Sequence, residues 1–474
     1  MNVARSSFKV FLAETVSVVL SFLAIMYYAR ELGAARLGTF FLFQATLFVL
    51  RRPADLGLRI AVQKRISEGS HPESVLTTSL LLKLGLLSLT IWGLLAVRGF
   101  VADYIGLDLT WFLVVALVLH ELSSLMKNAL SGELRVGETA IIDFVYNVVM
   151  YGGGVLLVYA GYGVVGLVVS VIAGLALRLV LAFRAVDTGF GRPSMERARS
   201  LAAYAKFTVV PSVGHQVHQW MDTLILGVLA TNAAVGVYEV AWRIGGPVLL
   251  AAQSIGVAIF PQFSSWDSAG SRDSIERLFS RVLTPSMFLV FPAFFGTLVL
   301  AEEILTLVFD AEFGAAWLAL IIIMAGKIPS GIKTLAGDAL YGLNKPKYVT
   351  IATIVTITAN FVLNVILISA FGIVGAATGT MVSVTIGMAL RTYYLSRFIE
   401  IRAPYDELGW CAVSAAAMGT VLYAAKTVVP VETAAGLFGF VATGVVLYGA
   451  FVLLYPPLKD QISAQLREFV PGLQ

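Results

Sequence analysis

The chain has 474 residues, of which 58% are hydrophobic and only 13% charged, and its formal net charge is +4. Soluble domains carry about 25% charged residues, so this composition excludes a soluble globular protein. The basic balance does not indicate a nucleic-acid-binding protein, because basic residues of membrane proteins collect on cytoplasmic loops. We therefore expect a chain that crosses a lipid bilayer many times.

Fourteen apolar stretches are each long enough for a bilayer-spanning helix, which takes roughly 20 residues. The first is too long for a signal-peptide core and has no small-residue cleavage site, so we expect a retained helix. The pattern predicts an all-α integral membrane protein with about 14 transmembrane helices. The stretches are approximately 8–29, 38–60, 75–97, 107–129, 139–160, 163–184, 205–229, 236–262, 281–301, 315–341, 348–370, 373–395, 408–427 and 433–456.

Basic residues are distributed unequally between the two ends of these helices. With the N-terminus in the cytoplasm, most of them, including Lys127, Arg178 and Arg391, fall at cytoplasmic helix ends or loops. The outer connections hold Arg30, Arg36, Arg98 and Lys426. This asymmetry predicts a multi-pass protein of the cell membrane with both termini in the cytoplasm.

Three short segments recur in order along the chain. Chance explains any one match, but three matches with nearly constant offset indicate an internal duplication. We expect two six-helix lobes in parallel orientation, residues 1–200 and 201–403, followed by two further helices and a cytoplasmic tail in 404–474. The paired segments are NALSG at 128–132 with DALYG at 338–342, GVVG at 163–166 with GIVG at 372–375, and LGTF at 37–40 with VGVY at 235–238.

The second apolar stretch is interrupted by Arg51, Arg52, Asp55 and Arg59. A charge at mid-bilayer costs on the order of 2.5 to 3.5 kcal/mol, so such residues should face a cavity or a partner. Arg52, Asp55 and Arg59 recur on one helical face, which fits a basic patch that holds a phosphate. Alternatively, Arg51 pairs with Asp55 at i,i+4 near the cytoplasmic end and has no binding role.

A polar stripe runs along one face of the seventh stretch. It should line the space between the halves, because contact with lipid would leave its polar groups unpaired. A histidine there can carry a coupling proton, since histidine titrates near physiological pH. The alternative is hydrogen-bonded packing between helices; zinc binding lacks a good third ligand. The stripe consists of Thr208, Ser212, His215, Gln219 and Asp222, with His218 alongside.

Further charged residues lie in later stretches. Glu239 and Arg243 are four residues apart and can form an ion pair, with Arg243 also a possible anion ligand. Lys327 and Lys333 can bind phosphate or extend to the membrane interface, and Asp338 follows on the same stretch. In the first half, Asp143 with Asn147, and Glu121 with Asn128, form shorter polar faces that we interpret as packing contacts.

No catalytic motif is evident. The chain has no GxxxxGK[ST] phosphate loop, HExxH or GxSxG motif, and its single cysteine, Cys411, excludes a disulfide framework. We expect neither a cofactor nor a metal, and no enzymatic activity.

Four segments carry a family resemblance: ARELGAARLGTF at 29–40, ADLG at 54–57, MD at 221–222 with GVYEVAWR at 236–243, and YGLNKP at 341–346. With them the chain resembles the multidrug/oligosaccharidyl-lipid/polysaccharide exporter superfamily, in its polysaccharide-transporter branch, over essentially its whole length. The resemblance implies two lobes around a central cavity that opens alternately to either side. It also implies that cationic side chains hold the substrate's phosphate, and Arg51 or Arg52 and Arg243 match that role by position.

The leading hypothesis is a flippase that moves a polyprenyl or dolichyl (pyro)phosphate-linked saccharide to the outer leaflet for glycoprotein or surface polysaccharide assembly, similar to archaeal dolichol phosphate-sugar flippases. Its expected partners are that lipid, membrane lipids, and glycosyltransferases or an oligosaccharyltransferase, with no nucleic acid, and we expect a monomer. One alternative is an ion-coupled multidrug exporter that relies on Asp143, Asp222 and Asp338. Another is a membrane enzyme with a site near Glu302 and Asp310.

Overall fold

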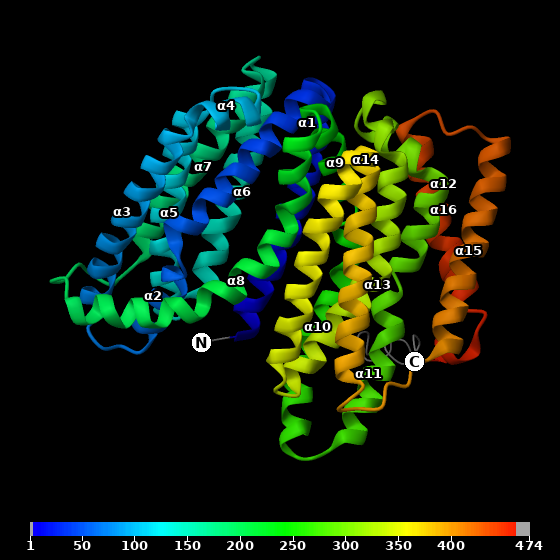
Figure 1. The fold of residues 1–474 in the computed structure, drawn as a ribbon. Coiled ribbons are helices and arrows are strands. Elements are labelled where there is room, and N and C mark those ends of the chain that lie inside the picture. The colour runs from blue at the N-terminus through cyan, green and yellow to red at the C-terminus, as the bar shows by residue number, and fades with distance from the viewer. Residues whose placement is uncertain (1–2, 461–474) are drawn as a thin grey trace. The chain divides into compact units, whose positions relative to one another are not determined.

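The computed structural model describes residues 3–460, and of residues 3–14 and 206–218 the backbone only. Every regular element of this part is helical, which confirms the predicted all-α class (Figure 1). Two short 3₁₀ helices occupy Pro247–Leu249 and Ala311–Ala316. The α-helices are α1 (Val3–Asp55), α2 (Leu58–Ser67), α3 (Pro72–Ala96), α4 (Arg98–Ile105), α5 (Thr110–Gly132), α6 (Val136–Tyr159), α7 (Gly163–Ala185), α8 (Met195–Leu229), α9 (Asn232–Ile244), α10 (Leu250–Ser268), α11 (Arg272–Met287), α12 (Val290–Val308), α13 (Trp317–Gly342), α14 (Pro346–Leu395), α15 (Tyr405–Val428) and α16 (Ala434–Val452).

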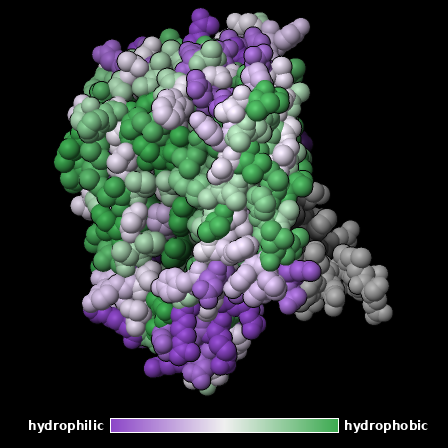
Figure 2. Space-filling model, turned by 90° about the vertical axis from the view of Figure 1, so that its right-hand side faces the viewer, coloured by the Kyte–Doolittle hydropathy of each residue, from purple (hydrophilic) through white to green (hydrophobic). Residues whose placement is uncertain are grey.

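Eleven helical segments of the described residues are long and apolar enough to cross a membrane. Two of them, α1 and α14, each contain two predicted spans joined at a kink, at Gly33 and Gly372 respectively. The predicted span 205–229 lies on α8. Figure 2 shows a broad band of apolar side chains between hydrophilic ends on the side of α15 and α16. The chain is therefore a multi-pass membrane protein.

The chain forms two compact units, Met1–Glu239 and Val240–Gln474. In the first, apolar side chains of α2, α3 and α5 pack around Leu201, at the start of α8. In the second, one core joins α10, α11, α13 and α14, and another joins α15 and α16. The finer division predicted at residues 200 and 403 stays a prediction.

The first pair of repeated segments ends a helix in the same way in each unit. After α5, Leu134 has a φ of 62° and Arg135 N–H donates to Leu130 O at 3.2 Å. After α13, Asn344 has a φ of 55° and Lys345 N–H donates to Leu340 O at 2.8 Å. This is the left-handed helix ending that satisfies otherwise unpaired carbonyls. The repeated sequence thus has the same local role twice.

The third pair of repeated segments meets within the first unit, where α1 crosses the start of α9. A Cβ on Gly38 would lie 1.7 Å from Asn232 O, and a Cβ on Gly236 would lie 2.0 Å from Ala34 O. The contact is reciprocal, since the partners are separated by the same 198 residues as the glycines. Only glycine permits backbones to approach this closely.

We expect Gly236→Ala to lower the melting temperature of the purified protein by about 2 °C or more, because the new methyl group forces two backbones apart. Gly85→Ala is the matched control, since a Cβ there has nothing within 4 Å and the residue lies in the helix α3. Differential scanning fluorimetry of both variants checks this. Equal melting temperatures for Gly236→Ala and the wild type would contradict the close contact.

Candidate functional site

A cluster of charged side chains gathers in the first unit, where α1 ends and α2 begins. The chain leaves α1 after Asp55 because Leu56 and Gly57 both have positive φ, at 44° and 80°. Asp55 Oδ1 then accepts a hydrogen bond from Arg59 N–H at 3.3 Å, which places its carboxylate at the start of α2. Arg59 therefore lies on a different helix from Arg51. The predicted single helical face through Arg52, Asp55 and Arg59 is wrong, because this turn interrupts the helix.

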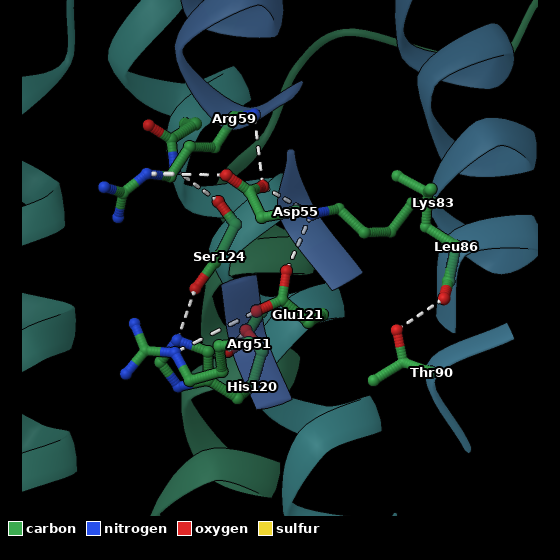
Figure 3. Close-up of polar contacts among 11 residues, drawn as sticks. Arg51, Asp55, Arg59, Lys83, Leu86, Thr90, His120, Glu121 and Ser124 are labelled. Carbon is green, nitrogen blue, oxygen red and sulfur yellow. Dashed lines mark hydrogen bonds and ion pairs between the residues drawn. The ribbon is translucent and has the colours of Figure 1, made fainter. Parts of the chain in front are cut away.

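Lys83 of α3 lies at the centre of the cluster (Figure 3). Its side chain is 0% exposed, and its Nζ donates to Asp55 Oδ1 at 2.6 Å and to Glu121 Oε2 at 2.7 Å. A buried ammonium group is tolerated when it is paired and hydrogen-bonded in this way. Lys83 thus links α1, α3 and α5 through two ion pairs.

The arginines contact the same carboxylates at longer range. Arg51 Nε lies 3.9 Å from Glu121 Oε1, and Arg59 Nε lies 3.7 Å from Asp55 Oδ2. Figure 3 shows both guanidinium groups extending from the carboxylates on the side opposite Lys83. Asp55 and Glu121 accept their short hydrogen bonds from Lys83. The Nη atoms of Arg51 and Arg59 can therefore donate to another acceptor.

The cluster carries more positive than negative charge. Arg52 also belongs to it, with its guanidinium 4.3 Å from the centre of the Phe48 ring. Four cations therefore accompany the carboxylates of Asp55 and Glu121. Such an excess inside a membrane-spanning region is costly unless an anion balances it. Partly exposed guanidinium groups are well suited to phosphate, which they bind through paired, charge-assisted hydrogen bonds.

A second ionic cluster in this unit contains Asp143, which the sequence suggested as a coupling residue. Lys127 Nζ donates to Asp143 Oδ2 at 2.7 Å, and Arg178 Nη2 lies 3.1 Å from Asp143 Oδ1. The predicted packing role of Asp143 is thus a double ion pair between α5, α6 and α7.

The polar stripe on α8 is described in part. Asp222 accepts a hydrogen bond from the Tyr238 hydroxyl, and Glu239 accepts one from Thr223. Gln219 is exposed. The remaining stripe residues lie outside the side chains that the structure describes; they are Thr208, Ser212, His215 and His218. The pairing of Glu239 with Arg243 stays a prediction.

The second unit holds its own cations. Lys327 of α13 is buried, with its Nζ 4.3 Å from the centre of the Trp242 ring. Arg391 of α14 donates from Nη1 to Lys333 O at 3.1 Å, so it contacts the helix that carries Lys333 and Asp338. Among the side chains described, no group of three or more histidines, cysteines or carboxylates could hold a metal ion.

The sequence missed the residue at the centre of the first cluster. Lys83 is a lone charge inside an otherwise apolar stretch, and that isolation was the available signal. The sequence places Lys127, Arg178 and Arg391 at cytoplasmic helix ends or loops, and the structure adds that each contacts a neighbouring helix. Their partners could not be read from spacing, since they come from different helices.

Comparison with known proteins gives a consistent result at the level of sequence. A model of the family described as polysaccharide biosynthesis protein matches residues 15–321. The chain is 41% identical over 471 residues to the probable low-salt glycan biosynthesis flippase Agl15 of Haloferax volcanii, which covers 99% of this chain and 100% of that one. It is 28% identical over 476 residues to the probable flippase AglR of the same organism, at 100% and 98% coverage.

Solved structures show the same fold. The lipid II flippase MurJ in an inward closed conformation matches with a TM-score of 0.82 at 15% identity, over 96% of this chain and 99% of that one. An inward-facing multidrug resistance transporter of the MATE family matches with a TM-score of 0.62 at 14% identity, over 81% and 95%. The family model confirms the predicted polysaccharide-transport branch, and these solved structures share the predicted fold.

Proposed function

The chain belongs to the polysaccharide biosynthesis protein family, and we propose that it is a flippase that moves a polyprenyl or dolichyl phosphate-linked saccharide from the cytoplasmic to the outer leaflet. The observation that carries the proposal is the excess of cationic side chains around Lys83 inside a membrane-spanning unit. A relative that matches over its full length and bears the name of a probable glycan flippase supports it.

In this mechanism the guanidinium groups of Arg51, Arg52 and Arg59 bind the phosphate of the head group. An unpaired anion is prohibitively costly in hydrocarbon, so charge-assisted hydrogen bonds must replace its lost hydration. The lipid tail stays in the bilayer while the head group passes through the protein, as one half of the molecule rocks against the other. Lys83 does not need to contact the substrate, because its ammonium group already donates hydrogen bonds to two carboxylates.

The second half contributes further ligands in this proposal. Arg243, Lys327 and Lys333 are cationic side chains in or beside its membrane-spanning helices, and each can follow the phosphate as the molecule changes state. The remaining polar candidates for lining the path or coupling to an ion are Asp55, Asp143, His215, His218, Gln219, Asp222, Glu239 and Asp338.

The ion-coupled multidrug exporter is less well supported. It needs intramembrane carboxylates that can take up and release a cation, but two of its three candidates are already engaged. Asp143 pairs with two cations, and Asp222 accepts a hydrogen bond from Tyr238; Asp338 is the third candidate. The membrane-enzyme alternative has no support from the relatives, which bear the names of flippases. We therefore infer that the chain transports and does no covalent chemistry.

The proposal includes an orientation and partners. Both termini lie in the cytoplasm, as the distribution of basic residues indicates. Glycosyltransferases supply the lipid-linked saccharide on that side, and an oligosaccharyltransferase or polymerising enzyme consumes it on the other. The flippase acts as a monomer.

Reconstitution into proteoliposomes tests the function. We expect the protein to move polyprenyl phosphate-linked glucose between leaflets faster than protein-free vesicles do, because the cluster compensates the phosphate charge. Accessibility of the sugar to a membrane-impermeant oxidant measures this. A cationic dye under an imposed proton or sodium gradient is the comparison. Dye transport without movement of the sugar lipid would reject the flippase and favour the exporter.

A further inference from the structure

Lys127 and Arg178, which form the second ionic cluster with Asp143, have no role in the mechanism above. The cluster's three side chains come from α5, α6 and α7, so the packing of these helices builds it. One carboxylate serves two cations, at 2.7 Å from Lys127 Nζ and 3.1 Å from Arg178 Nη2. These three side chains together therefore carry one net positive charge.

Arg178 points to a missing ligand. Its side chain is only 9% exposed, and its buried Nε has no hydrogen-bond partner among the residues that the structure describes. Its guanidinium lies 5.5 Å from the centre of the Tyr146 ring, so that aromatic ring covers it on one side. A buried donor without an acceptor is uncommon, and either an ordered water or a bound anion can supply the acceptor.

The cluster is accessible as well as charged. The side chain of Lys127 is 23% exposed and that of Asp143 is 38% exposed, whereas Arg178 is almost covered. The carboxylate and the ammonium group are thus partly exposed, whereas the guanidinium is largely covered.

The two clusters are neighbours along α5. His120 and Lys127 are seven residues apart, which places them on one helical face. Ser124 lies between them, with its Oγ 3.2 Å from His120 Nε2. Figure 3 shows His120 next to Arg51, and His120 interacts electrostatically with Arg51, Arg178 and Lys127. One head group that reaches Arg51 can therefore reach the second cluster.

We propose that Lys127 and Arg178 bind a second anionic group of the same lipid-linked head group, either the carboxylate of an acidic sugar or the second phosphate of a diphosphate link. The proposal rests on the proposed function and adds a substrate class to it. Asp143 balances one of the two positive charges before the substrate arrives, and the remaining charge is balanced when the anion binds. The protein then favours head groups with two anionic groups over those with one.

Binding of three short-chain probes to the full-length protein in detergent tests this. The probes are farnesyl phosphate-linked glucose, with one anionic group, and farnesyl phosphate-linked glucuronic acid and farnesyl diphosphate-linked glucose, with two. We expect Arg178→Gln and Lys127→Gln to weaken at least one of the two-anion probes roughly tenfold, the worth of one charge-assisted hydrogen bond, and to leave the single-anion probe unchanged. The probe that weakens identifies the source of the anion.

Asp143→Asn is expected to increase affinity, a result that misfolding would not produce. Removing the carboxylate leaves two cations for the ligand, so this variant should bind the two-anion probe more tightly than the wild type. The proposal would be overturned if Arg178→Gln and Lys127→Gln lost the same affinity for all three probes, or lost affinity for none. Weaker binding of the two-anion probes by Asp143→Asn would also overturn it. If the wild type binds the probes but moves none of them in proteoliposomes, the proposed function fails while this binding site stands.

Discussion

Arg51→Gln is expected to abolish movement of the phosphate-linked saccharide while the protein still folds. Arg51 is a phosphate ligand in the proposed mechanism, its side chain is 29% exposed, and its Nε lies 3.9 Å from Glu121 Oε1. Glutamine removes its charge-assisted hydrogen bonds, which are worth about 1.5 to 3 kcal/mol each, so losing two should slow transport by at least ~100-fold. Glu121 keeps its short hydrogen bond from Lys83, so the fold should persist.

The proteoliposome assay measures this effect, and thermal melting shows that the variant is folded. Arg98→Gln is the matched control, because Arg98 also pairs with a carboxylate, that of Asp108, but at an exposed site outside the membrane-spanning segments. The Arg98 guanidinium holds the pKa of Asp108 at about 2, so this pair is ionised under assay conditions. The control should transport normally. Unchanged transport by Arg51→Gln would remove it from the proposed anion site.

Lys83→Met is expected to have the largest effect on stability. Methionine has a similar volume but no charge, so Asp55 and Glu121 would lose the ammonium group that each contacts at 2.6 to 2.7 Å. Breaking a buried ion pair by removing one partner costs about 3 to 5 kcal/mol. We expect a much lower melting temperature and little folded protein in membranes.

Two comparisons make that result specific. Lys64→Met removes an exposed lysine that pairs with Glu68, and surface pairs contribute about 0 to 1 kcal/mol, so this control should melt like the wild type. The double variant Lys83→Met/Glu121→Gln leaves a single carboxylate, Asp55, which Arg59 still contacts, so it should recover part of the loss. If Lys83→Met alone melts like the wild type, the ion pairs of Lys83 with Asp55 and Glu121 have no stabilising role.

The predicted positions of the helices depended on local information. Each spanning stretch is recognisable because a bilayer of fixed thickness requires roughly 20 consecutive apolar residues. Errors arose at turns. The predicted span 38–60 continues past the point where α1 ends, because hydropathy does not register the positive φ angles of Leu56 and Gly57.

The partners of the charged residues were not predictable in the same way. Arg51 and Asp55 have the i,i+4 spacing of an ion pair, but the structure places Arg51 near Glu121 and Asp55 near Lys83 and Arg59. Lys83 is 28 residues from one of its partners and 38 from the other. Sequence spacing describes neighbours on one helix and cannot say which faces of different helices meet.

By itself the sequence determined that this protein is a membrane-embedded, all-α chain with internal repeats and an excess of cations in its apolar stretches. Those properties follow from the amino-acid composition and from the spacing of apolar residues and repeats along the chain. Neither depends on which distant segments pack together. Tertiary structure alone decided that Lys83 forms ion pairs with two carboxylates, that Gly38 meets Gly236, and that Lys127 and Arg178 share Asp143. The physical reason is that a buried charge is stable only beside its partner, and packing of separate helices is what brings the partners together.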